Sequence, residues 1–126
     1  MLMKIFLVED DKIYSDFIRK ALSQNEGYKV TPFSSAEDAI NEMSEDLPEV
    51  LIIDYKLPGM TGISMYESIK SKITDANKVI MLSAIDDGNM VLSFIQKGVR
   101  DYVIKDENVI EALEAVIDGR EDLFFR

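Results

Sequence analysis

The segment VLIID at residues 50–54 runs directly into the turn sequence YKLPGM at residues 55–60. Four apolar residues in a row predict a strand that is buried on both faces, as the central strands of parallel sheets are. Pro58 and Gly59 predict a tight turn shortly afterwards. The chain therefore passes from a buried strand to an exposed turn at one acidic residue, Asp54.

Short apolar strands alternate with helical periods along the whole chain. This alternation predicts an α/β fold of (βα)5 type, in which the five strands form one parallel sheet. Right-handed crossovers place helices on both faces of the sheet, which makes a flavodoxin-like three-layer sandwich. Sequence spacing does not determine strand order, so we adopt the order 2-1-3-4-5 of flavodoxin-like sheets. The predicted strands are residues 4–8, 28–33, 50–54, 78–82 and 101–104, and the later helices include residues 36–44 and 86–97, one from residue 61 and one from residue 108.

Local signals predict where several helices begin and end. Asp11 and Asn108 are expected to cap the first and last helices, and Ser35, three residues before Asp38, predicts a capping-box-like start for the second. Gly98 predicts the end of the fourth helix. The first helix is expected to bury one apolar face, formed by Ile13, Phe17, Ile18, Ala21 and Leu22.

The composition is that of one ordinary domain. The chain has 126 residues, of which 47% are apolar, enough for a core without disulfide or metal cross-links. We expect residues 1–120 to form this domain and residues 121–126 to be a tail or the start of a linker. Cysteine is absent, and the chain shows neither a signal peptide pattern nor an apolar run long enough for a membrane span. These features favour a cytoplasmic location.

The charge balance excludes some partners. The net charge is −10, which disfavours direct binding of nucleic acid or of anionic membranes by this domain, because both depend on Lys and Arg. Histidine is also absent. If phosphoryl groups are handled here, no histidine of this chain carries them, so their donor is another molecule.

Polar side chains follow four of the five predicted strands. Glu9 and Asp10 follow the first strand, Asp54 ends the third, Ser83 follows the fourth and Lys105 follows the fifth. In a parallel sheet these ends meet at one edge, where ligands bind. The sequence therefore predicts a site that combines three carboxylates, one hydroxyl and one ammonium group.

Three converging carboxylates need a compensating charge. Two carboxylates about 4 Å apart repel each other by roughly 4 kcal/mol at an effective dielectric constant of about 20. Oxygen ligands without His or Cys select a hard cation such as Mg²⁺ or Mn²⁺. Lys105 and the Ser83 hydroxyl can hold a phosphate, so the set indicates phosphoryl transfer with Asp54 as the nucleophile.

Four motifs resemble those of response-regulator receiver domains of two-component signalling: FLVEDD at residues 6–11, LIIDYKLPGMTG at 51–62, IMLSA at 80–84 and DYVIKD at 101–106. The resemblance covers nearly the whole chain. It implies a phosphorylation-dependent switch rather than an enzyme proper. It assigns Asp54 as phosphoacceptor, Glu9, Asp10, Asp54 and the Lys56 backbone carbonyl as metal ligands, Ser83 and Lys105 as phosphate-contacting groups, and Ser83 with Tyr102 as the switch pair.

The resemblance also implies partners. The phosphoryl donor would be a sensor histidine kinase, a phosphotransfer protein or a small acyl phosphate. The output surface, and a homodimer contact, would involve the fourth helix, fifth strand and fifth helix. Asp106 stands where many receivers have proline, as in a subgroup that often precedes a DNA-binding helix-turn-helix. Lys56 and Ile85 fall at positions that tune dephosphorylation in the family.

Each residue also has a simpler interpretation when taken singly. Ser83 alone would be an ordinary strand-end serine, Lys105 a surface lysine and Tyr102 a core residue. An aspartate-nucleophile phosphatase is a second function class. Such an enzyme needs a second aspartate two residues after the nucleophile, and in this chain that position holds Lys56. A third class is an interaction module that no longer takes phosphate, and the intact set of site residues argues against it.

Overall fold

The computed structural model describes residues 2–84 and 88–119. Five strands alternate with five helices, which confirms the (βα)5 prediction. The elements are β1 (Met3–Val8), α1 (Lys12–Leu22), β2 (Tyr28–Phe33), α2 (Ala36–Met43), β3 (Val50–Asp54), α3 (Gly62–Ile69), β4 (Lys78–Ser83), α4 (Gly88–Gln96), β5 (Asp101–Ile104) and α5 (Val109–Ile117). Ile85, the predicted helix start at Asp86 and the predicted tail at residues 121–126 lie outside the described residues.

The five strands form one parallel sheet in the order β2-β1-β3-β4-β5, which confirms the adopted order. From β1 the chain crosses to β2 on one side and then returns to β3 on the other. A crevice opens at the carboxyl ends of strands where the order reverses in this way. The register aligns Val8 with Ile53 and Asp54 with Leu82, so the ends of β1, β3 and β4 lie side by side.

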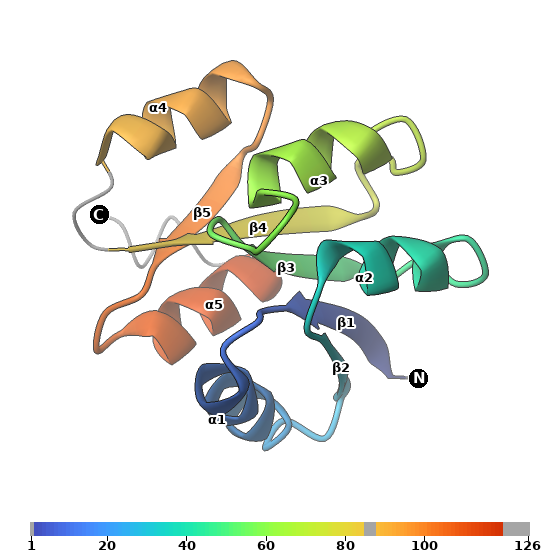
Figure 1. Ribbon diagram of the computed structural model, residues 1–126. Coiled ribbons are helices and arrows are strands. Elements are labelled where there is room, and N and C mark those ends of the chain that lie inside the picture. Colours follow the sequence, from blue (N-terminus) through green and yellow to red (C-terminus); the bar gives the residue numbers. More distant parts are fainter. Residues whose placement is uncertain (1, 85–87, 120–126) are drawn as a thin grey trace.

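Helices cover both faces of the sheet (Figure 1): α1 and α5 lie on one face, and α2, α3 and α4 on the other. All five residues of β3 are buried. Leu51 and Ile53 point into the core on the α2–α3–α4 face, whereas Val50 and Ile52 point into the core on the α1–α5 face. The apolar VLII run therefore serves two cores at once, as predicted for a central strand.

Among the helix-end predictions, those for Asp11, Ser35 and Gly98 are confirmed. The Asp11 carboxylate accepts hydrogen bonds from the Ile13 and Tyr14 amides, and the Ser35 hydroxyl accepts one from the Asp38 amide. Gly98 has a φ of +100° just after α4, a conformation that glycine adopts without the steric cost of a side chain.

The prediction that the Asn108 side chain caps the last helix is wrong. Its side chain makes no capping hydrogen bond, and its backbone is not extended. The Asn108 amide instead donates to the Asp106 carboxylate, two residues earlier. This local Asx-type turn fixes the chain entering α5 and orients Asn108 away from the usual cap geometry.

The predicted apolar face of α1 is partly wrong. Ile18 and Leu22 are buried, but Ile13 is 84% exposed and Phe17 is 49% exposed. The buried stripe runs through Ser15, Ile18 and Leu22, which share one side of the helix at 100° per residue. Ile13 and Phe17 lie off this stripe. The spacing of apolar residues did not predict which side of α1 is buried, because one of the buried positions is occupied by the polar residue Ser15.

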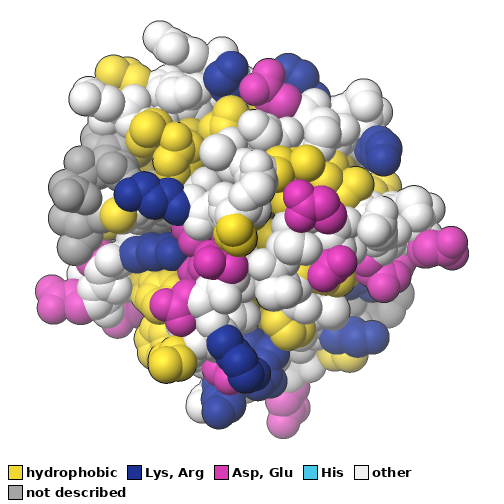
Figure 2. Space-filling view, viewed as in Figure 1, with side chains coloured by type: hydrophobic (Ala, Val, Ile, Leu, Met, Phe, Trp, Pro, Cys, Tyr) yellow, Lys and Arg dark blue, Asp and Glu magenta, His cyan; other side chains and the backbone are white. Residues whose placement is uncertain are grey.

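The described helices are short, and the longest, α1, has 11 residues. None of them has the length and apolar character that crossing a membrane requires. On the face seen in Figure 2, acidic side chains adjoin Lys and Arg side chains near the middle, and charges of both signs are spread around it.

Gly62 lies at the start of α3, against the backbone that follows β3. A Cβ atom added there would lie 2.6 Å from the Asp54 carbonyl oxygen and 3.0 Å from the Tyr55 Cα atom. Both neighbours are backbone atoms, so neither can rotate away. The Gly62 amide also donates to the Tyr55 carbonyl. Glycine thus lets α3 begin in direct contact with the segment that carries Asp54.

We expect Gly62→Ala to destabilise the fold by about 1–3 kcal/mol, because the added methyl group overpacks a site that backbone encloses. Urea unfolding would measure the loss as a lower midpoint. The control is Gly27→Ala, where an added Cβ meets only the end of the Asn25 side chain, at 3.2 Å. Equal midpoints for the two variants would contradict the prediction.

Candidate functional site

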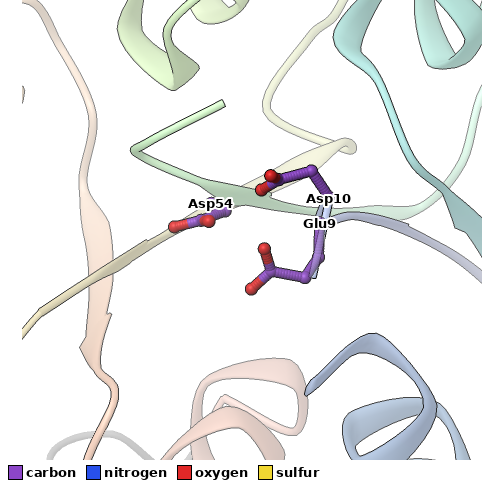
Figure 3. A group of neighbouring side chains, drawn as sticks. All are labelled: Glu9, Asp10 and Asp54. Atoms are coloured by element: carbon purple, nitrogen blue, oxygen red, sulfur yellow. The ribbon is translucent and has the colours of Figure 1, made fainter. Parts of the chain in front are cut away.

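Three carboxylates converge at the carboxyl edge of the sheet (Figure 3). Glu9 and Asp10 follow β1 and Asp54 ends β3, and one oxygen from each lies within 4.8 Å of the others. Glu9 is 2% exposed and Asp54 5% exposed, whereas Asp10 is exposed. The predicted convergence of these three residues is confirmed, with two buried acids and one acid at the surface.

Lys105 links the two buried acids. Its Nζ atom donates to Glu9 Oε1 at 2.8 Å and forms an ion pair with Asp54 Oδ1 at 3.1 Å. Because β4 lies between β3 and β5, the lysine at the end of β5 must reach across one strand. Its long side chain spans that distance. Lys105 therefore compensates part of the negative charge and is not an ordinary surface lysine.

Backbone amides add weaker support to the carboxylates. The Asp11 amide donates to Glu9 Oε2 at 3.3 Å, and the Lys56 amide donates to Asp54 Oδ1 at 3.4 Å. The Tyr55 amide donates to the Leu82 carbonyl, which extends the β3–β4 pairing past Asp54. The Tyr55 bond holds the turn after β3 against the sheet, and the Lys56 bond engages one oxygen of Asp54.

The proximity of the acids changes how they titrate. Burial raises the pKa of Glu9 from 4.5 to about 7, the contact with Asp54 acts in the same direction, and Lys105 opposes it. Burial by itself would lower the pKa of Lys105, but the hydrogen bond to Glu9 and the nearby carboxylate charges outweigh burial, so this pKa is raised. Lys105 stays a cation at neutral pH, while Glu9 exchanges a proton there.

The donor set fits a hard divalent cation. It consists of carboxylate oxygens from Glu9, Asp10 and Asp54, and such ligands suit Mg²⁺ or Mn²⁺. The three carboxylates carry more negative charge than the single ammonium group of Lys105 compensates. A cation at the cluster would relieve the excess.

Ser83 is nearby, at the end of β4. Its side chain is 1% exposed, and its hydroxyl has no hydrogen-bond partner within the described part of the chain. A buried hydroxyl without a partner is unusual, because leaving it unpaired costs about 1–3 kcal/mol. The Lys105 amide donates to the Ser83 carbonyl, so the end of β4 is bonded to the residue that follows β5. The role of this hydroxyl as a phosphate-contacting group stays a prediction.

Tyr102 is two residues before Ile104, which pairs with Ser83 in the sheet register. Its side chain is partly buried and packs against the core on the α2–α3–α4 face. This position agrees with its interpretation as a core residue, and the role of a switch partner for Ser83 stays a prediction. The proposed Lys56 carbonyl ligand likewise stays a prediction.

The sequence reasoning missed Tyr14. The centroid of its ring lies 4.8 Å from Lys105 Nζ. Like the Ser83 hydroxyl, the Tyr14 hydroxyl is buried and has no hydrogen-bond partner among the described residues. Burial raises the pKa of this hydroxyl. Tyr14 is in the first turn of α1, and no local pattern signals a contact with a lysine that lies far along the chain.

We expect Mg²⁺ affinity to depend on pH through Glu9. A carboxyl group must lose its proton to bind a metal ion, so below the pKa of about 7 the proton competes with Mg²⁺. Affinity should fall by about tenfold for each pH unit well below that value. Calorimetric titrations in buffers of different ionisation enthalpy would show nearly one proton released at about pH 6 and almost none at about pH 8.

The matched variant is Glu9→Gln, which keeps the size of the side chain and has no proton to release. It should bind Mg²⁺ more weakly, with an affinity that varies little over the same range. If the wild-type protein releases no proton on binding Mg²⁺ at any pH of this range, Glu9 is already ionised in the metal-free site.

Comparison with known proteins identifies the family. The family model described as "Response regulator receiver domain" matches residues 5–117. The chain is 32% identical over 117 residues to the phosphate regulon transcriptional regulatory protein PhoB of Rhizobium meliloti, covering 92% of this chain and 51% of that protein. It is 28% identical over 116 residues to the chemotaxis protein CheY of Listeria monocytogenes, covering 90% of this chain and 97% of CheY.

A solved structure supports the same family. The BeF3-activated receiver domain of DrrB, a Thermotoga maritima protein, superposes with a TM-score of 0.81 at 30% identity, over 97% of this chain and 99% of that domain. The chain spans about half the length of PhoB and nearly all of CheY. The family match includes Glu9, Asp54, Ser83 and Lys105. The chain therefore belongs to the response regulator receiver domain family.

Proposed function

We propose that Asp54 is the residue at which this receiver domain accepts a phosphoryl group, with Mg²⁺ or Mn²⁺ held by Glu9, Asp10 and Asp54. The donor would be a sensor histidine kinase, a phosphotransfer protein or a small acyl phosphate. One observation carries the proposal: Asp54 is buried beside two further carboxylates and is paired with Lys105 at 3.1 Å. A structural acid at a strand end would not need this surrounding charge.

The chemistry follows from these contacts. A carboxylate oxygen of Asp54 attacks phosphorus, and the bond from phosphorus to the donor breaks, so that the leaving imidazole or carboxylate takes the bonding electrons. Bound Mg²⁺ would neutralise charge on the phosphoryl oxygens. The Lys105 ammonium group offers a second positive charge beside Asp54, and the Ser83 hydroxyl can donate a hydrogen bond to a phosphoryl oxygen. Histidine is absent from the chain, so the phosphoryl group would come from another molecule.

Phosphorylation would add about −1.5 to −2 charges at this edge. The Ser83 hydroxyl would turn toward the new group, and Tyr102 would respond from the next strand. Both residues adjoin the surface of α4, β5 and α5, which we propose as the output and homodimer surface. The Lys56 carbonyl completes the proposed metal ligands.

We further propose a cytoplasmic location, a domain that ends near residue 120, and a longer DNA-binding regulator as one context for this domain. The 51% coverage of PhoB, a transcriptional regulatory protein, supports that context. The 97% coverage of CheY supports a regulator that consists of the receiver domain alone.

The test is to incubate the protein with Mg²⁺ and acetyl phosphate and to record its intact mass. We expect the mass of one phosphoryl group to be gained, and EDTA to prevent the gain. No gain in the presence of Mg²⁺ would favour an interaction module that does not take phosphate. Continuous release of phosphate from several unrelated phosphate esters would favour a phosphatase.

A further inference from the structure

The Tyr14 ring is in direct contact with the cation of the site. Lys105 Nζ lies 4.8 Å from the ring centroid, within the distance at which an ammonium group is attracted to an aromatic face. The same Nζ atom bonds Glu9 at 2.8 Å and Asp54 at 3.1 Å. The ammonium group is therefore held by two carboxylates and one ring.

We propose that Tyr14 is a positioning residue for phosphoryl transfer: its ring face holds the Lys105 ammonium group beside Asp54. This inference rests on the proposed function of Asp54, because it concerns the cation that assists that reaction. Tyr14 itself touches neither Asp54 nor Glu9 through any described hydrogen bond, so it acts through Lys105.

A lysine at this position needs such a guide. Its ammonium group ends a flexible four-carbon chain and is strongly hydrated, so it readily turns toward water. The Lys105 side chain is 24% exposed, which leaves it a path to solvent. The ring covers one side of the ammonium group with a surface that attracts the cation and offers no competing hydrogen bond.

The ring contact does not depend on the carboxylate oxygens. Glu9 and Asp54 are the groups that would also hold the metal ion of the proposed function, whereas an aromatic ring is not a ligand for Mg²⁺ or Mn²⁺. The contact between Tyr14 and Lys105 would therefore persist with a metal ion bound.

The contact uses the ring and not the hydroxyl. The Tyr14 hydroxyl is buried and has no hydrogen-bond partner in residues 2–84 and 88–119. Tyr14 also packs against the core on the α1–α5 face and lies 5.9 Å, centroid to centroid, from the Phe17 ring. Phenylalanine at position 14 would keep the ring and this packing, whereas leucine would keep an apolar side chain without a ring.

The experiment compares Tyr14→Phe and Tyr14→Leu with the wild-type protein in the acetyl phosphate reaction at saturating Mg²⁺. We expect Tyr14→Leu to lower the initial rate of phosphoryl gain about fivefold. A rate change of this size corresponds to the free energy of one partly desolvated cation–π contact. Tyr14→Phe should retain the wild-type rate. The matched control is Phe17→Leu, which removes the neighbouring exposed ring of the same helix and should leave the rate unchanged.

A second measurement separates positioning from a general loss of structure. Carbon-13 labelling of lysine would report the ring-current shift of the Lys105 ε-methylene group, which Tyr14→Phe should keep and Tyr14→Leu should lose. If Tyr14→Leu does not fold, Tyr14→Met takes its place, since methionine has similar reach and no ring.

The outcomes are distinct. A wild-type protein that gains no phosphoryl group defeats the proposed function, and the ring-current shift then still tests the contact. A wild-type protein that is phosphorylated together with a Tyr14→Leu variant of equal rate would overturn the inference about Tyr14 and leave Asp54 as acceptor. A slower Tyr14→Phe variant would also overturn it, because the hydroxyl would then be required.

Discussion

Asp54→Asn is expected to abolish phosphoryl gain from acetyl phosphate under conditions in which the wild-type protein is fully modified. Asparagine has nearly the same shape and keeps an oxygen that can accept from the Lys56 amide, so the turn after β3 should persist. Its amide is not a nucleophile toward phosphorus, and carboxylates are the groups that form aspartyl phosphates. Intact-mass spectrometry would record the loss directly.

Folding of this variant should not suffer. The substitution removes one of three carboxylates that lie within 4.8 Å of one another, and repulsion between them falls. Its urea midpoint should therefore be equal to or higher than that of the wild-type protein. The control is Asp106→Asn, which changes an exposed acid next to Lys105 and keeps the oxygen that accepts from the Asn108 amide. Normal phosphoryl gain by Asp54→Asn would assign the acceptor to another residue.

The second large effect is expected for Lys105→Met. Methionine fills similar space but has no charge, so developing negative charge on the phosphoryl group would lose a nearby cation. Removing one such preorganised electrostatic contact typically slows a reaction by about 10²–10³-fold. The initial rate of mass gain at saturating Mg²⁺ would measure the effect, and saturation ensures that weaker metal binding is not the cause.

Stability gives an independent test of the same variant. Without Lys105, the buried Glu9 and Asp54 lose the charge that compensates them, and leaving a buried charge unpaired is destabilising. The metal-free variant should unfold at lower urea concentration, and Mg²⁺ should restore much of the difference. Lys97→Met serves as control, since the Lys97–Glu67 pair is exposed and such pairs contribute little. A phosphorylation rate for Lys105→Met within twofold of the wild-type rate would falsify the assigned role.

Much of the fold could be predicted because its signals are local. The VLIID run identified the central strand, since only a strand covered on both faces places consecutive apolar residues in two cores. Asp11 and Ser35 marked helix starts through side chains that bond amides two or three residues ahead. The Asn108 prediction failed because Asp106, also nearby, captured the Asn108 amide. Two local signals competed, and the sequence does not rank them.

The buried face of α1 could not be predicted from the local sequence. Ile13 and Phe17 are apolar and suitably spaced, yet they are exposed, because the side of α1 that meets the core is set by how the helix docks on the sheet and α5. A helix that is rich in apolar residues can have more than one apolar face. The choice between them depends on the neighbouring elements.

The sequence by itself determined the five strands, the alternation with helices and the acids that follow the apolar runs, because strand and helix periods are properties of adjacent residues. Only the tertiary structure decided that Lys105 bonds both Glu9, 96 residues away, and Asp54, that Tyr14 covers Lys105, and that the Glu9 pKa rises to about 7. These contacts depend on strand order and on burial at one edge of the sheet. Both follow from the packing of the whole chain, and no short segment of it contains them.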